Sequence, residues 1–293
     1  MKLLLLILFF ISTAYAEQEW RDATGGCSTD IGQYQHYTLS DDCQLYNPNT
    51  IDSNYNNVYI TSLDISIRGT RNNESTTIDE NTDLVNVTAI PGNRHFYLNG
   101  ENATLTLSYI KLVGGDVREH DSLNWGGSIF IDDNGGELNL YSSIVFNNKA
   151  VFGGGIYAYG DSNTNKNDRI MNIDNSIIHN NTATYGDGGG IYMRNAVAII
   201  ENTTIDYNQA PGNSGFGGGM SIVSSAVTMK NTNISNNKAG DRGGGLYIRG
   251  DSTTVTLRQT SFIDNDATYQ GDAIRTYESP TISLINTYFN NPN

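Results

Sequence analysis

A pair of adjacent carboxylates is the most direct candidate for catalytic chemistry in this chain. Asp132 and Asp133 stand together, and Asp83 lies further upstream. Glycoside hydrolysis needs paired carboxylates, because one protonates the leaving oxygen while the other assists attack on the sugar. A polysaccharide lyase, which cleaves its substrate by elimination, would instead need carboxylate-bound Ca²⁺ and an Arg or Lys base. Because Asn134-Gly135-Gly136 follows directly, we interpret Asp132 and Asp133 as part of a polar turn and predict no catalytic residue.

Residues that could bind a metal ion show no ligand spacing. The histidines are scattered, and in so polar a chain we expect them to be exposed: His36, His95, His120 and His179. Asp187 and Asp241 stand beside glycine runs, as in calcium-binding Gly-Asp repeats, but the full nonapeptide pattern is absent. Turn chemistry explains both aspartates better. We therefore expect neither a metal ion nor a cofactor.

Aromatic residues recur at one position of a glycine motif and could contact a ligand. Each follows an apolar residue that comes after the glycines, as Tyr157 follows Ile156. If the apolar residue points inward, strand alternation turns the aromatic residue outward. A stacked, exposed ridge of this kind suits a binder of sugars or proteins. The predicted ligand-binding residues are Phe130, Tyr157, Tyr192 and Tyr247; the alternative is that they only stabilise strand pairing.

An internal repeat reveals the elements that must position these side chains. An apolar column is followed after three residues by an Asn column and after five residues by an Ala column. The apolar column is Val145, Ile178, Ile205, Ile234 and Phe262; the Asn column is Asn148, Asn181, Asn208, Asn237 and Asn265; the Ala column is Ala150, Ala183, Ala210, Ala239 and Ala267. Each unit then closes with a glycine motif, beginning at Gly126, Gly153, Gly188, Gly217, Gly243 or Gly271.

Two further apolar columns show how the units stack. They run from Leu105 and Leu107 to Ile282 and Leu284, with successive units 27 to 33 residues apart. Each unit holds short segments of period two and is too short to bury its own apolar face. The pattern predicts an all-β parallel β-helix of about eight to ten coils with pectin-lyase-like architecture. Leucine-rich repeats would need regularly spaced leucines, and helical repeats would need segments that form helices. The chain has neither.

The columns predict the corners of each coil. Asn tolerates positive φ better than most residues, so the Asn column is expected at a bend, with side chains hydrogen-bonded along the stack. The Ala column would pack inside that bend. The glycines would supply positive φ or close backbone approach at the next corner. The repeated stretch is thus one corner and one strand of a stacked coil.

These motifs resemble a known set. The glycine motif, preceded by an apolar-x-x-Asn element, is similar to the GGA(I/L/V) and FxxN repeats of polymorphic outer membrane proteins, over residues 105 to 293. The resemblance implies a right-handed parallel β-helix at a cell surface that acts in adhesion. The alanine of the family motif is present only as Ala273. Separately, Asn81-Thr82-Asp83 and Asp132-Asp133 resemble two of the four motifs of polygalacturonases, whose GHG and RIK motifs are missing.

The N-terminal sequence indicates export. Residues 1–16 hold one lysine, a short apolar run and the small-x-small pattern of a signal peptide, and no later apolar run predicts a transmembrane anchor. In an exported chain Cys27 and Cys43 should form a disulfide, since no CxxC spacing suggests a reactive thiol pair. We predict a signal peptide over 1–16, a disulfide-tied cap over 17–50 and the parallel β-helix over 51–293.

Composition and charge limit the binding partners that can be expected. The formal net charge is -14 without a basic segment, so nucleic acid is not an expected partner. We predict a secreted or extracellular protein, associated with a cell surface, that acts in adhesion or as a structural module with a glycan or a surface protein as ligand. The alternative is a secreted polysaccharide lyase or glycoside hydrolase. The sequence leaves the oligomeric state open.

Overall fold

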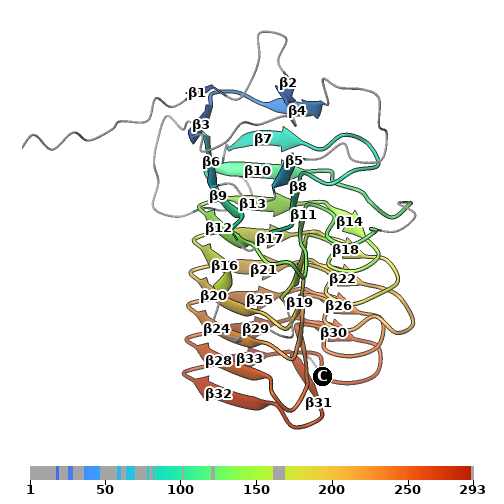
Figure 1. Cartoon of the computed structure of the whole chain (residues 1–293). Helices are drawn as coiled ribbons and strands as arrows, with labels where there is room; N and C mark the ends of the chain where they lie inside the picture. Colours follow the sequence, from blue (N-terminus) through green and yellow to red (C-terminus); the bar gives the residue numbers. More distant parts are fainter. Residues whose placement is uncertain are drawn as a thin grey trace, which may run out of the picture.

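The computed structural model describes residues 18–19, 26–28, 36–46, 58–60, 64–69, 78, 82, 84–100, 102–119, 123–160 and 169–291. Throughout these ranges the regular structure is strand alone, arranged as four parallel sheets that stack along one axis. The blue strands lie at one end of the stack and the red strands at the other (Figure 1). The predicted all-β parallel β-helix is confirmed, with about seven turns where eight to ten coils were expected.

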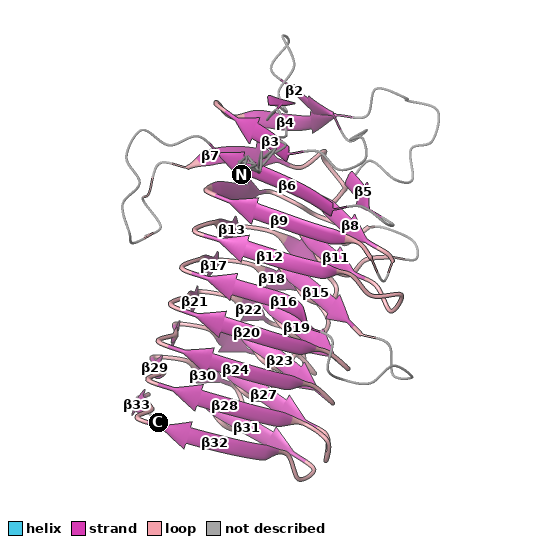
Figure 2. Ribbon diagram, turned by 60° about the vertical axis from the view of Figure 1, so that its left-hand side comes forward, coloured by secondary structure: helices cyan, strands magenta, loops and turns pink. Residues whose placement is uncertain are grey.

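Sheets A and B each contain ten strands. Sheet A is β1 (Gln18–Glu19), β3 (His36–Leu39), β6 (Asp64–Gly69), β9 (Thr104–Ser108), β12 (Glu137–Tyr141), β16 (Arg169–Asp174), β20 (Val197–Glu201), β24 (Ala226–Lys230), β28 (Thr254–Arg258) and β32 (Thr281–Ile285). Sheet B is β2 (Gly26–Ser28), β4 (Cys43–Tyr46), β7 (Val85–Thr88), β10 (Ile110–Val113), β13 (Ile144–Phe146), β17 (Ile177–His179), β21 (Thr204–Asp206), β25 (Asn233–Ser235), β29 (Ser261–Ile263) and β33 (Tyr288–Asn290). Figure 2 shows the arrows of sheet A lying parallel to one another from β6 to β32.

Sheets C and D are smaller. Sheet C is β5 (Val58–Ile60), β8 (Phe96–Leu98), β11 (Ile129–Ile131), β15 (Ile156–Tyr159), β19 (Ile191–Arg194), β23 (Met220–Val223), β27 (Leu246–Arg249) and β31 (Ile274–Tyr277). Sheet D is β14 (Lys149–Ala150), β18 (Thr182–Ala183), β22 (Gln209–Ala210), β26 (Lys238–Ala239) and β30 (Asp266–Ala267). Each complete coil runs through sheets C, A, B and D in that order, so residues about one repeat apart become neighbours.

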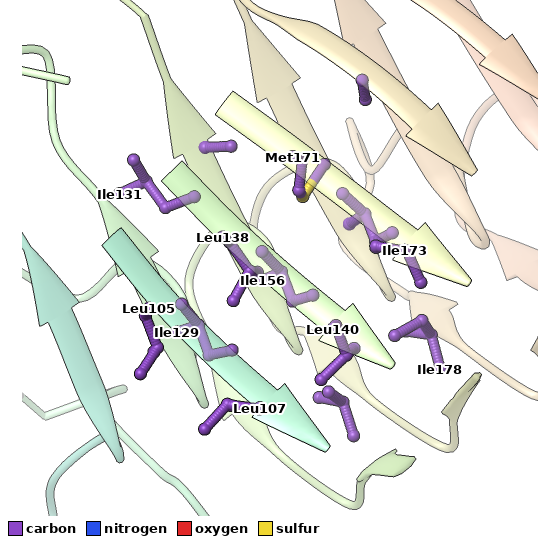
Figure 3. Packing of buried hydrophobic residues seen from close by; sticks show 14 of the residues in the cluster. Leu105, Leu107, Ile129, Ile131, Leu138, Leu140, Ile156, Met171, Ile173 and Ile178 are labelled. Atoms are coloured by element: carbon purple, nitrogen blue, oxygen red, sulfur yellow. The ribbon is translucent and has the colours of Figure 1, made fainter. Parts of the chain in front are cut away.

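The core follows from the period-two pattern of every strand. Leu105, Leu138 and Met171 occupy one column because β9, β12 and β16 pair in register. Figure 3 shows these side chains one after another on adjacent strands, close to Ile129 and Ile156 of sheet C. All five are fully buried. A continuous apolar core therefore runs through the stack, where no single coil could bury one.

The turn between sheets B and D is held by the Asn column. Each buried Asn donates from Nδ2 to the Oδ1 of the next, at 3.0 or 3.1 Å, from Asn148 to Asn265. The expected hydrogen-bonded ladder is confirmed, but the expectation of positive φ at these residues is wrong. Positive φ lies one position earlier, at Asn147, Asn180, Tyr207, Asn236 and Asp264. The chain bends there, which turns the following Asn side chain inward to the ladder.

The glycine motif forms the next corner, as predicted. The first glycine has positive φ, 70° at Gly188. A Cβ added to Gly189 would lie 2.2 Å from the carbonyl oxygen of Gly218 in the next coil. The motif therefore provides both the bend and the close approach of successive coils.

The N-terminal segment joins the same sheets. β1 and β3 belong to sheet A, β2 and β4 to sheet B, and Cys27 and Cys43 form the predicted disulfide. The strands expected to make a cap thus add parallel strands to the stack. Residues 1–16, and the expected boundary at residue 50, lie outside the described residues.

Candidate functional site

The aromatic column lies on the outer side of sheet C, as strand alternation predicted. Phe130 pairs with Tyr157, Tyr157 with Tyr192, and Ser221 stands between Tyr192 and Tyr247 in register. Phe130, Tyr157 and Tyr192 join Tyr97 in an apolar cluster separate from the main core. The direction of these side chains therefore agrees with the prediction.

Their predicted exposure is wrong. Phe130 is 0% exposed, Tyr157 8%, Tyr192 9% and Tyr247 4%. The cause is a second row of side chains, each placed immediately before a glycine motif, that folds back over the column. Trp125 stacks on Tyr157 at 5.2 Å between ring centroids, Phe152 meets Tyr192 edge-on at 6.0 Å, and Phe216 stacks on Tyr247 at 4.6 Å. We call Trp125, Phe152, Asp187 and Phe216 the covering row.

Asp187 belongs to the covering row, whereas the sequence was interpreted as placing it in an ordinary turn. It precedes Gly188 as Phe152 precedes Gly153 and Phe216 precedes Gly217. A small carboxylate in place of an aromatic ring leaves the column less covered here. The positions before the last two glycine motifs hold Arg242 and Gln270, so Asp187 is the acidic one of three non-aromatic residues at this place in the repeat. Its role becomes visible only when the row is known to fold over sheet C.

A hollow of about 350 Å³ lies at this place, on the outer side of sheet C. We call it the sheet C hollow. It is lined by Asp187, Tyr192, Arg194, Phe216, Val223, Ser224, Tyr247, Arg249 and Glu278. Two of the predicted ligand-binding residues, Tyr192 and Tyr247, line it. Phe130 and Tyr157 do not, and Phe130 has no exposed surface that a ligand could touch.

Burial dominates the titration of the groups in the hollow. It raises the pKa of Asp187 from 3.8 to about 7, although the Phe216 N–H donates to its Oδ1 at 3.1 Å and Arg249 favours its charged form. Burial also raises the pKa of Tyr192 and of Tyr247, so both phenols keep their protons at neutral pH. Asp187 can therefore change charge near neutrality, which an ordinary carboxyl cannot.

Two arginines flank the hollow. Arg194 and Arg249 occupy the same column of sheet C with Val223 between them in register. Two coil spacings separate them, about 10 Å along the stack. Arg194 lies over the Tyr159 ring at 5.6 Å and Arg249 over the Tyr277 ring at 5.4 Å. The Arg249 Nε lies 3.5 Å from the Glu278 carboxylate.

The carboxylates singled out in the sequence form a turn. Asp132 accepts the backbone N–H of Gly135 at 3.0 Å through its carbonyl, and its carboxylate accepts the Tyr97 hydroxyl. Asp133 is exposed in the same turn. The turn interpretation is confirmed, whereas Asn81 and Asp83 lie outside the described residues.

The expectation that the histidines are exposed is wrong for His179, whose side chain is 16% exposed with Nδ1 at 2.8 Å from the Asp206 carboxylate, and it is wrong for His95. His95 is fully buried, with Nε2 at 2.9 Å from the Val87 carbonyl oxygen and Nδ1 at 3.0 Å from the Ser128 hydroxyl. Burial lowers its pKa to about 4, so it is neutral in the folded protein. It fills a polar position inside the coil. Within the described part of the chain, no cluster of three or more His, Cys, Asp or Glu residues could hold a metal ion.

A second hollow of about 360 Å³ lies on the outer face of sheet A. Its lining is mostly small and hydroxyl-bearing, with Glu137 as its one acidic residue: Glu137, Val197, Ala198, Ile199, Ala226, Val227, Thr228, Thr254 and Thr256. A single carboxylate among such residues does not provide the acid and base of a hydrolase. The sheet C hollow is the better candidate site.

Comparison with known proteins agrees with the fold. Residues 166–289 match the family model described as a right handed beta helix region. No curated protein and no solved structure matches the chain. In the part of the chain that the structure describes, no helix is long and apolar enough to span a membrane. The match covers the coils from β16 onward, and the same parallel pairing continues upstream to β1. The chain is therefore a right-handed parallel β-helix repeat protein.

Proposed function

We propose that this protein is an exported, extracellular adhesion module that binds a glycan in the sheet C hollow. The interrupted covering row carries the proposal, because Asp187 opens a hollow beside tyrosines that are otherwise covered. Half-buried Phe216 is the main aromatic surface that could contact the apolar face of a sugar ring, together with the small exposed parts of Tyr192 and Tyr247. Arg194, Arg249 and Asp187 supply polar groups around those surfaces, the combination typical of small ligand sites.

Sequence features support an extracellular setting. Residues 1–16 have the pattern of a signal peptide, and the disulfide between Cys27 and Cys43 suits an oxidising compartment. The resemblance of the paired repeat motifs to polymorphic outer membrane protein passengers supports a role in adhesion at a cell surface.

Carbohydrate cleavage is the second candidate, and the raised pKa of Asp187 favours it. An acid with a pKa of about 7 could protonate a leaving group at neutral pH. The other carboxylate in the hollow, Glu278, follows β31, three strands of sheet C beyond β19. Asp187 and Glu278 stand beyond opposite ends of the sheet C strands, since Asp187 precedes β19 and Glu278 follows β31. Asp241, which also faces Asp187, is held in an ion pair with Arg242 at 3.2 Å. Binding without cleavage is therefore the function that the geometry favours.

A hollow-filling variant tests the proposal. The purified protein is passed over a panel of immobilised polysaccharides, and released reducing or unsaturated ends are measured in parallel. Val223→Phe places a ring in the hollow between Arg194 and Arg249 and should weaken retention at least about tenfold, a loss of about 1.4 kcal/mol. Thr228→Phe, on the exposed face of sheet A, is the matched control and should be retained like the wild type.

Three results would decide between the candidates. Retention that Val223→Phe abolishes, with no new ends, supports binding. New ends that disappear in Asp187→Asn would replace the binding proposal with an enzyme. If no polysaccharide is retained or cleaved, the glycan proposal is wrong.

A further inference from the structure

The basic residues of this acidic protein are unusually placed at the sheet C hollow. The chain has 17 Lys and Arg against 31 Asp and Glu. Arg194 and Arg249 nevertheless stand at equivalent strand positions on either side of one hollow, and both are exposed. The lining thus holds two guanidinium groups beside the carboxyl groups of Glu278 and Asp187, a larger share of positive charge than the composition predicts.

The charge of these arginines is only partly neutralised by the protein. Arg249 has Glu278 as its ion-pair partner, and their side chains are 51% and 38% exposed. Such a pair contributes little in water, so a ligand anion can compete with it. Arg194 rests on the Tyr159 ring, and among the described residues no carboxylate forms an ion pair with it. One cationic group in the hollow thus lacks an acidic partner in the described structure.

We infer that the sheet C hollow recognises a negatively charged substituent of its glycan, a carboxylate or a sulfate, which lies between Arg194 and Arg249. This inference rests on the proposed function and deepens it by naming the class of ligand. Guanidinium groups bind carboxylates and sulfur or phosphorus oxyanions through paired N–H donors. The aromatic walls would hold the sugar ring that carries the anion, so both kinds of contact select the same ligand.

Asp187 links this binding to pH. The charged and titratable groups that face it are Arg249 and Tyr247 of β27, Tyr192 of β19 and Asp241 of the turn before β27. When Asp187 is protonated it adds no negative charge beside the bound anion. When it ionises it repels that anion, so binding should weaken as pH rises through about 7.

The test compares three polymers that differ in charge. Dextran sulfate carries sulfates, polygalacturonate carries carboxylates, and dextran is neutral; their affinities are measured by affinity electrophoresis at pH 5.5 and pH 8.5 in constant salt. We expect one or both anionic polymers to bind, more tightly at pH 5.5, and dextran to bind at least about tenfold less well. Tighter binding of dextran sulfate would identify sulfate as the preferred anion, and tighter binding of polygalacturonate would identify carboxylate.

Two sets of variants locate the effect. Arg194→Gln with Arg249→Gln should weaken binding at least about tenfold, since each removes charged donors. Lys230→Gln with Arg258→Gln is the matched control, because these exposed residues are register neighbours on sheet A and carry the same charge. Asp187→Asn should retain binding and lose most of the change between the two pH values.

Two outcomes would overturn anion recognition alone, and a third would also overturn glycan binding. Dextran bound as tightly as the anionic polymers, in a manner that Val223→Phe abolishes, would leave a glycan-binding hollow without anion recognition. Equal losses in the arginine and control pairs would mean general attraction of polyanions. Absence of binding to every polysaccharide would overturn both proposals together.

Discussion

At the scale of single residues, Asp187 shows how one position in a column changes the chemistry of a surface. Phe152 and Phe216 hold the equivalent places in neighbouring coils and cover the aromatic column. A carboxyl in that row is buried among rings, and burial disfavours its charged form. The residue therefore opens the hollow and gives it a group that titrates near neutral pH.

The raised pKa of Asp187 predicts a stability change with pH. Its pKa is about 7 in the folded protein against 3.8 for the ordinary carboxyl. Between these values the folded state holds a proton that the unfolded state has lost, so stability should fall as pH rises from about 4 to about 7 and then level off. The slope attributable to this group is at most about 1.4 kcal/mol per pH unit.

Chemical denaturation at a series of pH values measures this slope. Asp187→Asn cannot ionise, so its free energy of unfolding should lack the contribution. The difference between wild type and variant should change mainly between pH 4 and pH 7. Parallel curves across that range would show that Asp187 is not buried as the structure has it.

At the scale of elements, the turn between sheets B and D depends on a chain of identical side chains. Asn208 accepts from the backbone N–H and Nδ2 of Asn181, both at 3.0 Å, through its Oδ1. Its own Nδ2 donates to the Ile178 carbonyl oxygen and to Asn237. Each Asn thus satisfies buried groups of the coils on both sides, which ties the coils into one cooperative unit.

Asn208→Ala should destabilise the protein more than an ordinary surface change. It leaves buried donors and acceptors of Asn181, Ile178 and Asn237 without this partner, and we expect a loss of about 3 kcal/mol in the free energy of unfolding. Asn213→Ala, at an exposed turn position, is the matched control and should change stability by less than about 0.5 kcal/mol. Equal effects of the two substitutions would contradict the structural role of the ladder.

At the scale of the whole molecule, the stack has a well-packed middle and an open last coil. Leu284 and Phe289 occupy the same columns as Leu257 and Phe262 one coil earlier. They are 51% and 44% exposed, whereas Leu257 and Phe262 are fully buried. A solenoid gains stability from contacts between neighbouring coils, so a coil with one neighbour is the least stable.

Paired substitutions test this gradient of stability. Leu257→Ala should cost about 2 to 5 kcal/mol, because it removes a buried side chain and leaves a cavity. Leu284→Ala should cost less than about 1 kcal/mol, since water already reaches that side chain. Denaturation with urea measures both. A similar cost at the two positions would indicate that the last coil is covered in solution.

The sequence by itself determined the coil. The apolar, Asn, Ala and glycine columns recur at a nearly constant spacing, and each column meets its own copy in the next coil, so local pattern and tertiary contact carry the same information. For this reason the strands, the inward Ile156 and Leu138 and the Asn ladder could be read from the chain. The disulfide was predicted separately, from two cysteines in a chain that carries an export signal.

Only the tertiary structure decided what covers the coil. Turns before glycine motifs fold over sheet C, so the exposure of Tyr157 is set by Trp125. Asp187 lies among Phe216, Asp241 and Arg249, which are 29, 54 and 62 residues further along the chain. Strand alternation fixes which way a side chain points, but it contains no information on whether a turn from the same or the preceding coil lies above it. The candidate site arises from that second layer, where turns of unequal length replace the regular repeat.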